Sequence, residues 1–188
     1  MTPYRTAGMF ALVLLTASPA ARATQVTLLD TRALVRESSA IVIGQIEGSS
    51  ARWNESHSMI VTEVTVQVSQ TLKGPASQRL TLRQIGGEVD GLRYSIEGSP
   101  NFTPGEEALL FVWRDSAGNM QVDGLAQGKF DITRDPATGE RMVQRSLKGL
   151  AIRDAKTLRM VGPGASAQPI TLNSLVREIQ AALGEAGR

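Results

Sequence analysis

The sequence predicts a mainly β protein: a single small barrel or sandwich with a short N-terminal helix and a C-terminal amphipathic helix. The first sign is residues 60–74, where Val64, Val66 and Val68 alternate with polar residues, as in a strand with one buried face. The second is that turn signals separate about eight short apolar runs, which is typical of small barrels and sandwiches. Only two stretches have helical spacing.

Residues 1–23 are predicted to be a signal peptide. Arg5 precedes a short apolar run over 7–17, and Ala21 and Ala23 provide the small residues that signal peptidase requires at −3 and −1. The run is shorter than the roughly 20 residues that span a bilayer; a membrane anchor is the alternative. Cleavage leaves residues 24–188 as one domain, predicted to be periplasmic or secreted.

Charge and cysteine content narrow the function classes. Removal of the leader, with Arg5 and Arg22, brings the 20 basic residues of the chain level with its 18 acidic ones. A neutral chain without a basic run gives no electrostatic case for nucleic acid or for a membrane surface. The absence of cysteine excludes disulfides, thiol nucleophiles, zinc ribbons and iron–sulfur sites.

The first elements are predicted as follows. Residues 28–38 have the spacing of an amphipathic helix with Thr27 as its N-cap. Residues 40–46 form an apolar strand in which Gly44 permits a bend or bulge. A polar connection over 48–58 then leads to the long strand.

The middle of the chain contains the stretch of most interest for function. Residues 79–85 and 92–97 both alternate and are separated by the glycine-rich segment 86–91, so we expect them to pair as a hairpin around it. A loop with two prolines follows over 98–105. Residues 107–114 are the most hydrophobic strand and are predicted to be central, with Trp113 in the core.

The last part of the chain contains further short strands over 120–125, 129–133 and 141–146, separated by turns. The chain ends with a predicted helix at about 171–184. Thr171 is its expected cap, Gly184 is its expected end, and one apolar stripe consists of Leu172, Leu175, Val176, Ile179 and Leu183.

Two resemblances bear on architecture. The segment Ile41-Val-Ile-Gly44, followed by a long alternating strand that ends in Leu72-Lys73-Gly74, resembles the OB-type barrel of tissue inhibitors of metalloproteinases and netrin-like domains. This resemblance implies an OB-like barrel. The inhibitors chelate the protease metal through an N-terminal cysteine, which this chain lacks, so no functional residue is carried over. The segments around Gly86-Gly87-Glu88 and Gly128-Lys129-Phe130 resemble a recurring pattern of exported bacterial proteins and imply no activity.

The 86–91 segment is the leading candidate for a contact surface. Three glycines surround Glu88 and Asp90 and could expose backbone N–H groups to an anion, or the two carboxylates to Ca²⁺. The simpler interpretation is a wide hairpin in which Gly86, Gly87 and Gly91 supply positive φ. Binding residues favour loops on rigid scaffolds, so a partner-contact surface formed by these residues and by Phe102 of the next loop is also predicted.

Catalysis has weaker support. His57 is the only histidine, and its serine and glutamate neighbours point in different directions on an extended segment, so no triad is predicted. One histidine without cysteine also makes a zinc site unfavourable, and no metal or cofactor is predicted.

Together these features predict an exported, non-enzymatic binding or accessory module that contacts a protein partner through barrel-end loops. The resemblance suggests an exported protease as that partner. The alternative function is a hydrolase that uses the carboxylates of Glu88 and Asp90 in the 86–91 loop.

Overall fold

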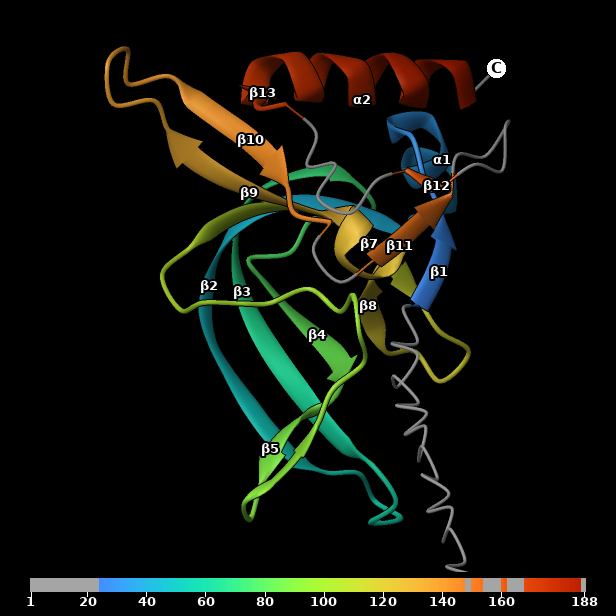
Figure 1. Ribbon diagram of the computed structural model, residues 1–188. Helices are drawn as coiled ribbons and strands as arrows, with labels where there is room; N and C mark the ends of the chain where they lie inside the picture. Colours follow the sequence, from blue (N-terminus) through green and yellow to red (C-terminus); the bar gives the residue numbers. More distant parts are fainter. Residues whose placement is uncertain (1–23, 148–149, 154–159, 162–167, 187–188) are drawn as a thin grey trace, which may run out of the picture.

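The computed structural model describes residues 24–147, 150–153, 160–161 and 168–186 (Figure 1). The predicted signal peptide, with Ala21 and Ala23, lies outside these residues.

Five strands close a small barrel, which confirms the predicted fold class. In order around the barrel they are β2 (Ala40–Trp53), β3 (Ile60–Lys73), β4 (Arg79–Ile85), β8 (Met120–Val122) and β7 (Glu107–Arg114). Neighbouring strands are antiparallel except β4 and β8, which pair in parallel through Leu82 and Met120. Pairing of β7 with both β8 and β2 closes the ring.

The other strands branch off this barrel. The edge of β7 is shared, because its first half pairs with β9 and its last three residues pair with β8. The sheet therefore continues beyond the barrel through β9 (Lys129–Arg134), β10 (Arg141–Arg145) and β13 (Ile170–Thr171). Two smaller sheets are β1 (Thr24–Thr27) with β11 (Leu150–Arg153) and β12 (Met160–Val161), and the hairpin of β5 (Gly87–Val89) and β6 (Leu92–Tyr94).

Two α-helices flank the sheet at the end far from the β5–β6 hairpin (Figure 1). The first, α1 (Thr31–Glu37), is capped by Asp30, whose carboxylate accepts a hydrogen bond from the Ala33 N–H at 2.7 Å. Thr27, the predicted cap, belongs to β1. The second, α2 (Leu172–Ala186), begins as predicted, since Thr171 Oγ1 accepts a hydrogen bond from the Ser174 N–H at 3.2 Å.

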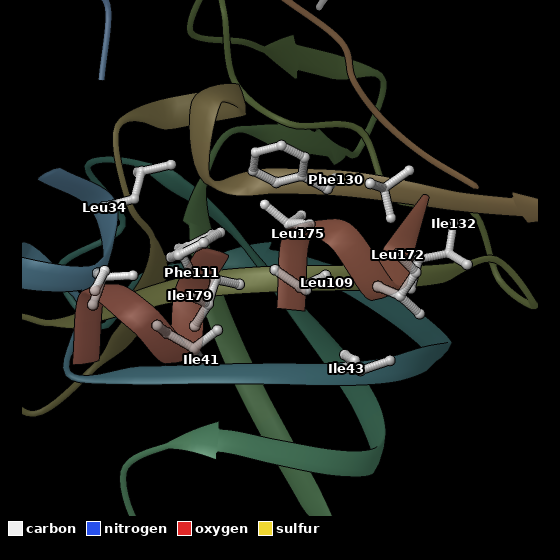
Figure 2. Packing of buried hydrophobic residues seen from close by; sticks show 13 residues of the cluster. Leu34, Ile41, Ile43, Leu109, Phe111, Phe130, Ile132, Leu172, Leu175 and Ile179 are labelled. Carbon is white, nitrogen blue, oxygen red and sulfur yellow. The ribbon is translucent and has the colours of Figure 1, made fainter. Parts of the chain in front are cut away.

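Two hydrophobic cores share a wall. One fills the barrel, and the other lies between the outer face of the sheet and the helices (Figure 2). Strands β2 and β7 serve both cores. Ile41, Ile43, Leu109 and Phe111 face the helices, while the residues that alternate with them face the barrel interior. This two-sided burial explains why both strands read as continuous apolar runs rather than as alternating ones.

Three predictions about elements are wrong. The polar stretch 48–58 is a connection only from residue 54 on, because β2 runs to Trp53 and pairs with β3 as far as Trp53↔Ile60. Strand β4 pairs with β3 rather than with 92–97, and the hairpin forms between Gly87–Val89 and Leu92–Tyr94. The predicted strand 120–125 ends at Val122, and a 3₁₀ helix (Leu125–Gly128) follows.

Two smaller expectations are also wrong. Trp113 is 37% exposed. It lies on the same face of β7 as Leu109 and Phe111 but is not part of the core cluster to which they belong. Gly184 does not end α2, which continues to Ala186, because Gly184 is not in the left-handed conformation of a helix stop.

Candidate functional site

The site begins with the β5–β6 hairpin, which lies against the far end of the β2–β3 ribbon (Figure 1). Its two-residue turn consists of Asp90 and Gly91, with φ of 53° and 76°, which is the type I′ geometry that an Asp-Gly pair favours. The sequence prediction of positive φ in this segment is confirmed, although the hairpin is tight rather than wide.

Gly86 and Gly87 attach the hairpin to the barrel wall. The Gly86 N–H donates to the Ile60 carbonyl at 2.9 Å, and Thr62 Oγ1 donates to the Gly86 carbonyl at 2.6 Å. At Gly87, where φ is 141°, a Cβ would lie 2.6 Å from Thr62 Oγ1 and 2.8 Å from Ala51 Cβ. Only glycine lets the chain pass this close to β2 and β3.

The loop 98–105 lies beside the hairpin and is fixed at several points. The Ala126 N–H donates to the Gly98 carbonyl, Gln84 Nε2 donates to the Pro100 carbonyl, and the Gly105 N–H donates to the Ile46 carbonyl, each at 2.8–2.9 Å. Phe102 is half-buried and packs against the barrel core. The loop is therefore a rigid part of the barrel end.

These two segments and the inner face of the ribbon enclose an open groove of about 420 Å³, which we call the barrel-end groove. The sequence-predicted residues Gly86, Gly87, Glu88 and Phe102 line it. Asp90 and Gly91 do not, because they form the turn at the tip of the hairpin. The structure thus brings together the two loops that the sequence analysis selected, and separates Glu88 from Asp90.

Several polar side chains in the groove have no hydrogen-bond partner among the described residues. They are Ser49, Ser95, Ser99 and Asn101. The charged residues are balanced, since Glu88 pairs with Arg93 at 3.0 Å. The groove is therefore neutral and offers solvent-accessible hydroxyl and amide groups beside apolar surface from Tyr94 and Ile96.

The local sequence pattern does not reveal that strand residues also line the groove. Ser49 lies in a polar stretch that is typical of a connection, and it lines the groove because β2 extends to Trp53. The length of β3 is the signal that could have revealed this. A long strand needs a partner along its whole edge, so β2 is expected to be as long as β3.

His57 lies apart from the groove. It occupies the turn after β2 with φ 52°, and its ring stacks on Trp53 with centroids 6.2 Å apart. Its ring makes no hydrogen bond within the described residues, and the neighbouring hydroxyls of Ser56 and Ser58 bond to each other at 2.8 Å. The geometry gives His57 a packing contact and no nucleophile.

Within the described ranges, no group of three or more His, Asp or Glu side chains is placed to hold a metal ion. In the same residues, neither helix is long and apolar enough to cross a membrane. Comparisons with family models, with curated proteins and with solved structures gave no match.

Proposed function

We propose that this chain is an exported, non-enzymatic binding module that holds an extended segment of a partner protein in the barrel-end groove. The observation that carries the proposal is a set of solvent-accessible groove side chains that make no hydrogen bond within the described part of the chain, namely Ser49, Ser95, Ser99 and Asn101. A polypeptide in extended conformation presents one N–H and one C=O per residue, which are the groups that such hydroxyls and amides satisfy.

The rigidity of the groove supports this role. The Gly86 bonds to β3 and the 98–105 bonds to β2, β4 and the 3₁₀ helix already fix both walls. A preformed groove loses little conformational entropy when it binds a ligand, so more of the contact energy appears as affinity. Its size is in the lower part of the range of ligand pockets, about 300–1,000 Å³, and suits a few residues of a segment.

The carboxylate hydrolase is the weaker alternative. Two catalytic carboxyl groups must face the scissile bond together. Here Glu88 is ion-paired with Arg93, and Asp90 lies in the hairpin turn outside the groove lining. This arrangement favours binding over hydrolysis.

The test uses one pair of neighbouring serines on β2. Ser49 pairs with Val64 and lines the groove, whereas Ser50 pairs with Glu63 on the opposite face, and both are exposed. Ser49→Arg places a long side chain in the groove without breaking a hydrogen bond. Ser50→Arg adds the same charge to the same strand outside the groove and is the matched control.

A phage-displayed library of random linear peptides is selected on residues 24–188, and enriched peptides are measured by fluorescence anisotropy. We expect binding to the wild type and to Ser50→Arg, and at least about a tenfold weaker affinity for Ser49→Arg. Failure to enrich any linear peptide, or equal affinity for both variants, would overturn the proposal. An exported protease, the partner class that the resemblance suggests, is the first full-length protein to test with the same pair of variants.

A further inference from the structure

A small apolar pocket adjoins the barrel-end groove where β4 meets β8. It has a volume of about 80 Å³, and we call it the seam pocket. Six of the residues that line it also line the barrel-end groove, namely Gln84, Ile85, Ile96, Ser99, Pro100 and Phe102. The two spaces therefore share a wall, and a segment that lies in the groove passes beside the pocket.

The pocket forms because the barrel is closed by few hydrogen bonds at this point. β4 and β8 pair in parallel through Leu82 and Met120 alone, and the described structure contains no second pair between them. Both strands continue past this pair, β4 to Ile85 and β8 to Val122, and the residues that follow it line the pocket. Leu82, which belongs to the barrel core and is 1% exposed, also lines it. Side chains of the barrel core thus form part of the wall of an open pocket.

The chemistry of the lining favours an apolar occupant. Leu82, Val122 and Leu125 complete the apolar wall that the shared residues begin. Polar side chains of the lining direct their donors to other parts of the protein. Arg83 Nη1 donates to Asn119 Oδ1 at 3.2 Å, Gln84 Nε2 to the Pro100 carbonyl at 2.9 Å, and Gln121 Nε2 to Asp115 Oδ2 at 3.2 Å. A polar group that entered the pocket would lose water and gain few partners.

The backbone at Leu125, in the lining of the pocket, is strained. Its φ is 62°, in the left-handed region, and it directly follows Gly124, whose φ is also 62°. A bulky residue rarely adopts this conformation, which persists where the surrounding structure imposes it and is common at ligand contacts. The next residue is fixed, because the Ala126 N–H donates to the Gly98 carbonyl at 2.9 Å. This strain is a second feature that is typical of a contact site.

The size of the pocket limits what it can hold. An apolar cavity of about 150 Å³ holds a benzene ring, so a pocket of about 80 Å³ suits one smaller aliphatic group, such as the side chain of valine or leucine. A side chain anchored in such a pocket commonly dominates the affinity of a bound segment, while its backbone supplies the remaining contacts.

We propose that the seam pocket binds one aliphatic side chain, of the size of valine or leucine, from the segment held in the barrel-end groove. The proposal rests on the proposed function for the origin of that side chain, and it adds a sequence preference to that function.

The first experiment titrates methyl-¹³C-labelled residues 24–188 with three small probes and follows the methyl resonances by NMR. The probes are Nα-acetyl-leucine amide, Nα-acetyl-asparagine amide, which has a polar side chain of similar size, and Nα-acetyl-phenylalanine amide, which has a larger apolar one. We expect saturable shifts at Leu82, Val122 and Leu125 with the leucine probe, weaker shifts with phenylalanine and none with asparagine. Equal or larger shifts with either of the other probes, or no shifts with leucine, would overturn the proposal.

The second experiment changes the size of the pocket and uses the peptides selected on the groove. In each peptide, replacement of one aliphatic residue by asparagine should lower the affinity at least about tenfold. Val122→Ala enlarges the pocket, so the affinity for a peptide with phenylalanine at that position, relative to the leucine peptide, should rise by about tenfold. Val68→Ala is the matched control, because Val68 is also a partly buried valine of the barrel core but does not line the pocket.

An unchanged ratio of the two affinities in Val122→Ala, or the same change in Val68→Ala, contradicts the proposal. If Val122→Ala lowers the melting temperature strongly, Ile96→Ala replaces it, because Ile96 lines the pocket from the loop side and lies outside the strands of the barrel.

The two proposals fail in different ways. Peptides that depend on Ser49 and bind equally well with asparagine at every aliphatic position would overturn the seam pocket and leave the groove function intact. Shifts at the seam pocket with the leucine probe, without any peptide that depends on Ser49, would overturn the groove function and leave the pocket's preference for an aliphatic group intact.

Discussion

At the residue scale, Asp123 is a buried acidic residue, with 8% of its surface exposed. Burial raises the pKa of its carboxyl, and the nearby charge of Glu37 raises it further. The Ser38 hydroxyl at 3.4 Å, the Gly124 N–H and the charge of Lys73 oppose this rise without cancelling it. Ionised Asp123 therefore costs the folded state free energy.

The sign of the resulting pH dependence follows from linkage. The raised pKa of Asp123 means that the folded state holds this proton to higher pH than the unfolded state does. In the unfolded state the carboxyl has the ordinary pKa of an aspartate, about 3.9. The contribution of Asp123 to stability is complete below that value and is lost as pH rises through the folded pKa. We expect Asp123→Asn, which does not titrate, to gain stability relative to wild type between about pH 4 and pH 7, measured from urea unfolding midpoints.

Asp115 provides a control of opposite sign. The side chain of Asn119 and the N–H groups of Ala117 and Asn119 hold the pKa of its carboxyl below the usual value. Its contribution is present at neutral pH and is lost as pH falls, so Asp115→Asn should lose more stability at pH 7 than at pH 3. A difference between Asp123→Asn and wild type that does not vary with pH would contradict the assignment.

At the element scale, Gly44 determines how β2 meets β3. The pairing of the two strands shifts register between Ile43 and Gly44, which confirms the predicted irregularity. A Cβ at Gly44 would lie 2.5 Å from the Gln67 carbonyl oxygen and 2.8 Å from Val66 Cγ1. The first of these is backbone inside the ladder, so it has little freedom to move away.

We expect Gly44→Ala to lower the free energy of unfolding by about 1–3 kcal/mol, the usual cost of forcing an extra methyl group into a packed site. Gly48→Ala is the matched control on the same strand, because nothing lies within 4 Å of a Cβ there and its φ is not positive. That variant should equal wild type or gain a few tenths of a kcal/mol, since alanine costs less entropy than glycine on folding. Equal urea midpoints for the two variants would show that the close approach at Gly44 is relaxed in solution.

Elements with a local sequence pattern could be predicted, and elements that depend on long-range pairing could not. Strands β3 and β7 were predictable because one strictly alternates and the other is apolar throughout, and both patterns are local. The end of β2 was not, because Gly48-Ser49-Ser50 reads as a polar loop and becomes a strand only by pairing with β3. β1 has four residues and pairs with β11, more than 120 residues away in the chain, which no local pattern reveals.

The candidate site divides in the same way. The glycines at 86 and 87 indicate a backbone with positive φ, and Asp90-Gly91 indicates a turn. The groove itself depends on which long-range surfaces the hairpin and the 98–105 loop contact. The ion pairs of Lys129 have a weaker signal: Lys129 and Asp131 lie two residues apart on one strand, and only the fold brings Glu106 to them.

At the scale of the whole molecule, the shared wall of β2 and β7 links the barrel core to the helix-covered core. Ile43 and Phe111 belong to the core that α2 covers (Figure 2), while Val42 and Leu110 on the same strands belong to the barrel core. A loss of order in either core removes support from these two strands. Separate unfolding of the helices and of the barrel should therefore be unfavourable.

This coupling predicts one cooperative transition. Ile179→Ala, at a fully buried position of α2, and Val66→Ala, at a fully buried position inside the barrel, each create a cavity. We expect losses of about 2–5 kcal/mol for the isoleucine and somewhat less for the valine. Helical circular dichroism reports mainly on α1 and α2, and tryptophan fluorescence reports on Trp53 at the end of β2 and Trp113 at the end of β7. In both variants the two signals should shift to a lower urea concentration together.

If the helix signal of Ile179→Ala moved while the tryptophan signal stayed in place, the two cores would be independent, and the walls of the barrel-end groove would not depend on the helix layer.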